Sequence, residues 1–292
     1  MSQSPQTMIG LELPDVDTWS DRVVVALGQI PSVFTGPGTN TYLVGTGTSR
    51  ILLDTGSGLT EYMPVLEQAL GHAGCEEIQE IVLTHGHPDH IGGAEAVIER
   101  YGPLSVSKRP WPGVDERYDV EITPIDDGAV IETEGATLRA LHTPGHAEDH
   151  LCFILEQEHS LFSGDNVLGV GTTVIPGQGG NLLDYMNSLE RLLQEQPGSI
   201  YPAHGPLIPD GQAKLREYID HRHEREEQII AALSDGPLNI AEIVKVVYVG
   251  YPESLHAAAG SSVCSHLLKL DSERRARCSN IAEPMTAIWE NV

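Results

Sequence analysis

The stretch Thr84–Gly93, THGHPDHIGG, gathers three histidines and an aspartate between His85 and His90. His85, His87, Asp89 and His90 form an H-x-H-x-D-H pattern of imidazoles and a carboxylate, which are the ligands that borderline divalent cations prefer. The spacing lets alternate side chains point to different sides of one pocket. A histidine-rich surface loop with incidental metal affinity is the alternative, and the pattern favours a metal site.

Three further residues of ligand type follow apolar runs and have glycine neighbours. They are His146 in TPGHAEDH, Asp165 in FSGDNVLG and His204 in YPAHGP. The seven candidates suit Zn²⁺ first, with Fe or Mn as alternatives, and an aspartate can bridge two such ions. Two divalent metal ions would hold a hydroxide between them at neutral pH and polarise the bond that it attacks. The set therefore predicts hydrolysis without a serine or cysteine nucleophile.

The remaining histidines carry weaker signals. His142 and His150 flank the TPGH segment and could support its histidine, but an ordinary surface or packing role is the favoured interpretation. We expect the others to be structural: His72, His159, His221, His223, His256 and His266.

The elements that must position these residues follow from the apolar patterns. Residues 22–54 alternate apolar and turn residues as short strands do, and residues 59–74 have helical spacing. IQEIVLTH reads as a buried strand that ends at the histidine cluster, and strands return over residues 120–163. A helix and a last strand, SIYPAHG, complete an α/β fold with two sheets and helices outside. Helical spacing dominates afterwards, so we divide the chain into a catalytic domain (1–209) and a C-terminal helical module (210–292).

Composition limits the classes of partner. Lys and Arg number 17 against 42 Asp and Glu, a net charge of -25, which repels phosphate backbones and anionic lipid surfaces. The four cysteines show no C-x-x-C spacing, which indicates a reducing compartment. The start of the sequence lacks a basic segment followed by an apolar run, and no 18-residue apolar stretch occurs. We expect a cytoplasmic protein with no membrane partner, an organellar matrix being the alternative.

The order THGHPDH, TPGH, SGD and PAHG resembles the metallo-β-lactamase fold superfamily, over roughly residues 22–206. The resemblance implies an αββα sandwich with a dinuclear site along one edge. By it, His85, His87 and His146 would hold one metal, Asp89, His90 and His204 the other, and Asp165 would bridge them. Asp89 is also the candidate catalytic residue, which would orient the attacking hydroxide or relay its proton.

Finer similarity lies in GTNTYLVGTG, ILLDTG, SGDNVLGVGTT and LLDYMNSL, which resemble the β-lactamase-like protein 2 group, close to the glyoxalase II family. Residues 240–270 resemble that group's winged-helix-like tail. The resemblance implies hydrolysis of small esters or thioesters, including acyl-carrier thioesters, or else cleavage of single-stranded RNA by the same site.

Charge bears on this choice. With 17 basic residues and no aromatic-basic interleaving, the chain lacks an evident groove for single-stranded RNA, although two bound cations would grip a phosphate locally. Only 38 residues separate Asp165 from His204, too few for the large inserted domain of the RNA-processing nucleases of this fold. We therefore favour a small ester or thioester substrate and keep single-strand-specific endoribonuclease activity as the alternative.

The C-terminal module suggests a third class, a nucleic-acid-binding regulator. We rank it last because residues 240–270 offer only Lys245 and Lys269 as basic residues. The module covers a wall of the active site or forms a homodimer face, or its apolar rows form its own core; these rows include Ile243, Val246, Val247 and Leu267. True β-lactamase activity is not indicated by the fold alone.

Three departures from the resembled group bear on the substrate. Gly86 stands where the nearest relatives resemble T-H-W-H, which removes a bulky aromatic beside the site. Residues 176–181 form a glycine-rich insertion, and residues 108–118, KRPWPGVDERY, form a loop rich in proline. Because such loops border the pocket in this fold, we expect a shifted substrate preference, with tolerated surface variation as the alternative.

Overall fold

The computed structural model describes residues 8, 10–32, 35–175, 179–250 and 256–292. These residues form two compact units. The first comprises the described residues of the ranges 8–143, 149–173 and 192–214, and the second comprises those of the ranges 144–148, 174–191 and 215–292. No helix among the described residues is both long enough and apolar enough to span a membrane.

A seven-stranded sheet forms one layer of the first unit, with its strands in chain order. The strands are β1 (Val16–Ser20), β2 (Val23–Leu27), β3 (Asn40–Val44), β4 (Ser49–Leu53), β5 (Glu77–Val82), β6 (Val106–Lys108) and β7 (Ile122–Pro124). β1 to β4 pair antiparallel, whereas β4 to β7 pair parallel. The parallel half needs crossovers: α1 (Tyr62–Ala73) connects β4 to β5, α2 (Pro88–Ile91) and α3 (Ala94–Tyr101) connect β5 to β6, and residues 109–121 connect β6 to β7.

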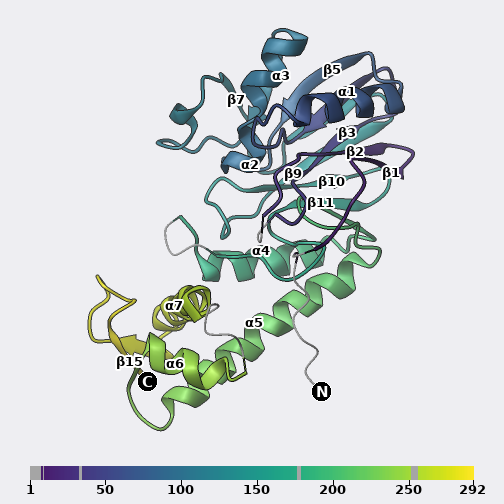
Figure 1. Ribbon diagram of the computed structural model, residues 1–292. Helices are drawn as coiled ribbons and strands as arrows, with labels where there is room; N and C mark the ends of the chain where they lie inside the picture. The colour runs from purple at the N-terminus through teal and green to yellow at the C-terminus, as the bar shows by residue number, and fades with distance from the viewer. Residues whose placement is uncertain (1–7, 9, 33–34, 176–178, 251–255) are drawn as a thin grey trace. The chain divides into compact units, whose positions relative to one another are not determined.

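Helices α1 and α3 cover the outer face of this sheet (Figure 1). The buried face of α1 carries Tyr62, Val65, Leu66 and Ala69, at the spacing that puts side chains on one side of a helix. Leu43 and Leu52 of the sheet pack in the same core.

The second layer is a five-stranded sheet of order β12-β11-β10-β9-β8. Its strands are β8 (Val130–Thr133), β9 (Ala136–His142), β10 (Leu151–Leu155), β11 (Ser160–Gly164) and β12 (Ile200–Pro202). A second core fills the space between the sheets, where Val25 and Leu53 pack with Phe153 and Phe162. β2 is apolar throughout because its alternate residues face the helices and this inner core.

The remaining helices are η1 (Asp115–Arg117), a single 3₁₀ turn, and α4 (Leu182–Gln194), α5 (Gly211–Leu233), α6 (Ile240–Val247) and α7 (His256–Ser272). A three-stranded sheet of order β13-β15-β14 accompanies α6 and α7; its strands are β13 (Leu238–Asn239), β14 (Ala276–Cys278) and β15 (Ile288–Asn291). The helical pattern of the sequence did not reveal this sheet, because its strands are short and carry charged residues such as Arg277 and Glu290.

The C-terminal elements have a core of their own. Ile243 and Leu267 are buried in it with Trp289, whereas Val246 is 56% exposed. Asn239 begins α6 with a capping box, since its side chain accepts from the Glu242 amide and the Glu242 carboxylate accepts from the Asn239 amide. The apolar row of α6 is thus explained in part by its own core, and Val246 lies outside that explanation.

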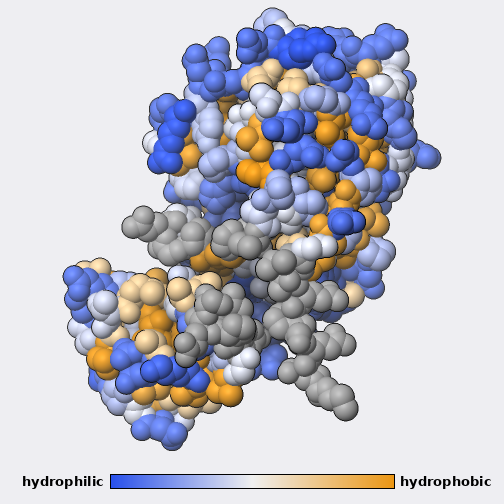
Figure 2. Space-filling model, in the orientation of Figure 1, coloured by the Kyte–Doolittle hydropathy of each residue, from blue (hydrophilic) through white to orange (hydrophobic). Residues whose placement is uncertain are grey.

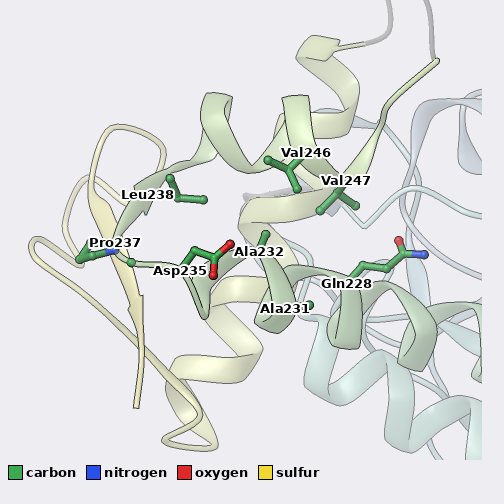
Figure 3. Close-up of a pocket in the computed structure, with 9 residues that line it drawn as sticks. Gln228, Ala231, Ala232, Asp235, Pro237, Leu238, Val246 and Val247 are labelled. Atoms are coloured by element: carbon green, nitrogen blue, oxygen red, sulfur yellow. The ribbon is translucent and has the colours of Figure 1, made fainter.

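A groove of about 620 Å³ lies between the end of α5 and α6. Figure 3 shows Val246 and Val247 on one side and Ala231 and Ala232 on the other. Asp235 is the single ionisable residue among those that line it, so the groove carries no set of catalytic groups. Hydrophilic residues cover much of the face seen in Figure 2, as the 42 acidic residues lead one to expect.

Candidate metal centre

The candidate ligands of the first unit lie at the ends of neighbouring strands. His85 and His87 follow β5, and Asp89 and His90 lie in the short helix α2. Asp165 and His204 follow β11 and β12, which pair in parallel and so end at the same edge of their sheet. The Leu151 amide donates to the Thr84 carbonyl at 2.7 Å, which joins this edge to the other sheet.

Six of the seven sequence-predicted residues, all of the first unit, fall into two clusters, and within each cluster the ligand atoms lie within 4.8 Å of one another. One cluster is His85, His87 and Asp165, and the other is Asp89, His90 and His204. The seventh, His146, belongs to the second unit. Asp165 reaches the second cluster too, because its Oδ1 lies 3.3 Å from His90 Nε2 and 3.1 Å from His204 Nε2. Its carboxylate therefore lies against both groups of histidines.

Burial and the facing carboxylates set the charges of this edge. Burial lowers the pKa of His85 well below its ordinary value, and the neighbouring His90 and His87 lower it further, so His85 stays neutral. Burial opposes charge on His204, but Asp165 and Asp89 outweigh it and raise its pKa to about 9. Burial would raise the pKa of Asp89, but His90 and His204 hold it below the ordinary range, so Asp89 is ionised.

Three imidazoles present the same nitrogen to the site. A carbonyl or carboxylate oxygen can only accept, so Nδ1 carries the proton in each ring. His90 Nδ1 donates to Asp54 Oδ2 at 2.8 Å, and His146 Nδ1 donates to the Val174 carbonyl at 2.9 Å. His204 Nδ1 donates to the Gly38 carbonyl at 3.4 Å. Nε2 is thus the atom of each ring that a metal ion would bind, and in the metal-free chain the raised pKa values of His90 and His204 keep a proton on it in those two rings.

His90 gives a test of whether these residues fit a metal. Its ring is fully buried, and its Nε2 makes no hydrogen bond to any residue the structure describes. That atom faces Asp89 Oδ2 at 3.5 Å and Asp165 Oδ1 at 3.3 Å. A buried imidazole nitrogen between two carboxylates suits a divalent cation, which supplies the missing partner and offsets the negative charge.

Asp54 is a functional residue that the sequence analysis missed. It is almost fully buried at the end of β4, and it accepts from the Thr84 amide at 2.8 Å, from Thr84 Oγ1 at 2.9 Å and from His90 Nδ1 at 2.8 Å. Its φ of 60° lies in the left-handed region, where aspartate is tolerated better than most residues. Asp54 directly follows the apolar run of ILLDTG and has Gly56 two positions later, which is close to the signal that identified Asp165 beside Gly164.

The main chain of His90 is held as firmly as its ring. Its carbonyl accepts from the Thr55 amide at 2.8 Å and from Thr55 Oγ1 at 2.6 Å. Gly93 makes this approach feasible, because a Cβ at that position would lie 2.0 Å from the Thr55 carbonyl oxygen. The turn after β4 and the α2 segment thus pack backbone against backbone.

His150 supports the site, contrary to the ordinary role that the sequence favoured. It is fully buried, and its Nε2 accepts from the Asp165 amide at 3.1 Å. Its Nδ1 therefore carries the proton, which it donates to Thr143 Oγ1 at 3.1 Å. His142 lies at the partly exposed end of β9, where its amide donates to Asp127.

The loop of residues 108–118 lies beside the first cluster, as the sequence predicts. The Trp111 ring centroid is 6.0 Å from that of His87. At Gly86 a Cβ would meet Lys108 and Val114 atoms at 3.3 Å, so residues of this loop occupy the space beside the glycine. Of the other predicted loop, residues 176–178 lie outside the described residues.

Comparisons with known proteins agree with this geometry. A family model described as "Metallo-beta-lactamase superfamily" matches residues 34–204, and one described as "Beta-lactamase associated winged helix domain" matches residues 240–281. The chain belongs to the metallo-β-lactamase superfamily. It is a hydrolase of that superfamily with a histidine and aspartate metal site, and the predicted αββα sandwich with its C-terminal winged-helix domain is confirmed.

Individual relatives of this superfamily member extend the match over nearly the whole chain. The Drosophila melanogaster protein named beta-lactamase-like protein 2 homolog is 37% identical over 290 residues, which are 95% of this chain and 97% of that protein. An Aspergillus chevalieri protein named atrochrysone carboxyl ACP thioesterase is 40% identical over 273 residues, 90% of this chain and 85% of its own. A beta-lactamase domain protein from Burkholderia ambifaria shares the fold with a TM-score of 0.81, at 18% identity over 97% of this chain and 96% of that one.

Proposed function

We propose that this hydrolase cleaves small esters or thioesters at a dinuclear centre, with Zn²⁺ as the first candidate metal. Two adjacent clusters of imidazoles and carboxylates support two ions. The thioesterase name of the Aspergillus chevalieri relative, at 40% identity, supports a thioester as substrate. The observation that carries the proposal is the position of Asp165, whose carboxylate belongs to one cluster and lies within 3.3 Å of both Nε2 atoms of the other.

In this proposal His85, His87 and His146 hold one ion, and Asp89, His90 and His204 hold the other. Asp165 is the shared ligand. Asp54 and His150 keep His90 and Asp165 in place, as hydrogen-bonded partners of ligands do in other metal sites.

The reaction adds water to the carbonyl carbon and breaks the bond to sulfur or oxygen, giving a carboxylic acid and a thiol or alcohol. When bound, the two cations would lower the pKa of a water molecule and polarise the substrate carbonyl. Asp89 Oδ2 accepts from Thr39 Oγ1 at 3.2 Å and lies beside His90 and His204. Because the pKa of Asp89 is lowered, it is a weak base, and we assign it the orientation of the attacking water rather than the uptake of its proton.

The test combines metal analysis of the purified chain with a substrate panel. We expect two divalent ions per chain, turnover of an acetyl thioester and an acetyl ester, and loss of turnover in a chelator with recovery on adding Zn²⁺. His204→Ala should lose the ion of the second cluster, whereas His223→Ala, an exposed position on α5, should keep both. Full turnover by the metal-free chain would refute the proposal. Cleavage of single-stranded RNA oligomers without thioester turnover would replace the proposed substrate by the alternative one.

A further inference from the structure

Trp111 lies beside the candidate metal centre and has no part in the chemistry described above. Its ring is tilted 50° to that of His87, with the centroids 6.0 Å apart. The side chain is partly exposed, and the exposed Pro110 and Pro112 flank it. An indole in this position offers a broad, rigid apolar face next to a candidate metal ligand.

A buried charge network fixes the segment that carries this indole. The Trp111 amide donates to Asp115 Oδ2 at 2.6 Å, and Asp115 Oδ1 lies 2.7 Å from Lys108 Nζ. Lys108 is fully buried at the end of β6, and its ammonium also contacts Asp149 Oδ2 at 2.6 Å and donates to the Arg109 carbonyl at 2.8 Å. The buried ammonium thus lies in ion-pair contact with two carboxylates and donates one hydrogen bond to the main chain.

Gly86 lets this network approach the ligand-bearing segment. A Cβ there would lie 3.3 Å from Lys108 Cε, 3.3 Å from Val114 Cγ1 and 3.4 Å from Asp115 Oδ1. The loop therefore packs on bare main chain between His85 and His87. In this chain the aromatic group beside the site comes from the loop at Trp111 rather than from position 86.

We propose that Trp111 selects the acyl group of the substrate. Its indole forms an apolar wall beside His87, on which an aromatic or medium-length aliphatic acyl group packs, so that such substrates are hydrolysed in preference to acetyl substrates. A cationic group would also pack on an indole, but two divalent ions close by would repel it. Lys108 and Asp115 are positioning residues that hold the wall in place. This inference rests on the proposed ester or thioester hydrolysis.

The test measures kcat/KM of the metal-loaded full chain for acetyl, butyryl, hexanoyl and benzoyl thioesters of N-acetylcysteamine. We expect Trp111→Ala to lower the benzoyl-to-acetyl ratio of kcat/KM at least tenfold, chiefly through a higher KM for the benzoyl thioester, and Trp111→Phe to keep most of the preference. Asp115→Ala should also lower the benzoyl-to-acetyl ratio although Trp111 is still present, because the Trp111 amide loses its acceptor. The matched control is Trp19→Phe, because Trp19 packs on Tyr42 and Tyr201 rather than on a ligand.

Product binding gives a readout that does not need turnover. Calorimetric titration of the metal-loaded chain should show benzoate binding at least tenfold more tightly than acetate, and this difference should shrink at least fivefold in Trp111→Ala. A parent chain that hydrolyses no member of the panel contradicts the proposed function. An active parent whose acyl preference and product preference are unchanged in Trp111→Ala contradicts the role of Trp111 alone.

Discussion

Asp54→Asn should weaken one of the two proposed metal sites and spare the other. The Asp54 carboxylate accepts from the Thr84 amide and Thr84 Oγ1 on one side and from His90 Nδ1 on the other. Asparagine has the same shape and tolerates the φ of 60°, but it has a single acceptor oxygen. The amide NH₂ must then face either the Thr84 amide or His90 Nδ1, and both are donors.

Each of the two orientations of the asparagine amide carries its own cost. If the NH₂ faces His90, the imidazole relieves the conflict by moving its proton to Nε2, the atom that lies 3.5 Å from Asp89 and 3.3 Å from Asp165. A protonated Nε2 cannot bind a metal. Replacing a residue that orients a ligand in this way costs about 10- to 100-fold in metal affinity, or about 1.4–2.7 kcal/mol. If the NH₂ faces Thr84 instead, an unsatisfied buried amide costs the fold about 1–3 kcal/mol.

The assay is a zinc titration against a chromophoric chelator of known affinity, which resolves two binding steps. We expect the site with Asp89, His90 and His204 to weaken about 30-fold, and the site with His85, His87 and His146 to stay within about threefold because Asp54 contacts none of its imidazoles in the bonds described above. Urea unfolding of the metal-free chain measures the cost to the fold separately.

Glu158→Gln is the matched control, since its carboxylate accepts from Tyr201 Oη at 2.8 Å in the same unit and contacts no candidate ligand. Two unchanged zinc steps in Asp54→Asn, together with an unchanged free energy of unfolding, would show that the Asp54 contact to His90 does not orient a metal ligand.

Three further predictions concern stability. Burial lowers the pKa of His266 in α7 to about 4, so between pH 6.5 and pH 4 the unfolded chain binds a proton that the folded chain does not. As the pH falls through this window, the free energy of unfolding should therefore decrease by about 3 kcal/mol. Urea titrations should show that His266→Leu removes this decrease. Gly86→Ala should destabilise the metal-free chain by about 1 kcal/mol, because the neighbouring Lys108 and Asp115 are held in ion pairs and yield little. Lys108→Met should cost about 3–5 kcal/mol, because two carboxylates lose their buried partner.

Each of these has a matched control. His223→Gln, exposed on α5, should leave the acid sensitivity as in the parent, and equal sensitivity in His266→Leu would contradict the burial argument. Gly71→Ala, in α1 with open space around it, should raise the melting temperature, corresponding to about 0.5–1 kcal/mol. Lys245→Met, on the exposed side of α6, should change the free energy of unfolding by no more than about 0.5 kcal/mol. An equally small effect of Lys108→Met would show that the Lys108 ion pairs do not hold the loop of residues 108–118 in place.

The sequence predicted the parts of the site that carry chemistry in their own residue type. His85 to His90 stand out because three of the chain's 13 histidines occur within six residues after an apolar run. His146, Asp165 and His204 were found by the same rule, a ligand-type residue beside glycine after a strand. Their convergence depends on which strands are neighbours, and the resemblance to a known fold supplied that information.

The sequence did not reveal the residues that support the ligands, because their partners lie far away in the sequence and are brought close only by folding. Lys108 reads in the sequence as an ordinary cation at a strand end, yet the fold closes Asp115 and Asp149 around it, 7 and 41 positions away. Nothing in the sequence distinguishes His150 from the other histidines, because its hydrogen bond with the Asp165 amide forms only in the folded chain. β14 and β15 were missed since each has few residues, and their pairing rather than their composition defines them.

The backbone contact between the turn after β4 and the α2 segment has a consequence for protein engineering. A designer who copies H-x-H-x-D-H into another scaffold transfers the imidazoles without the Thr55 and Gly93 pair that locks the His90 carbonyl. In such a graft, part of the free energy of cation binding would be lost in ordering a flexible peptide, whereas in this chain the segment is already held in place. The smallest transplantable unit is therefore the pair of segments 54–58 and 84–93, moved together.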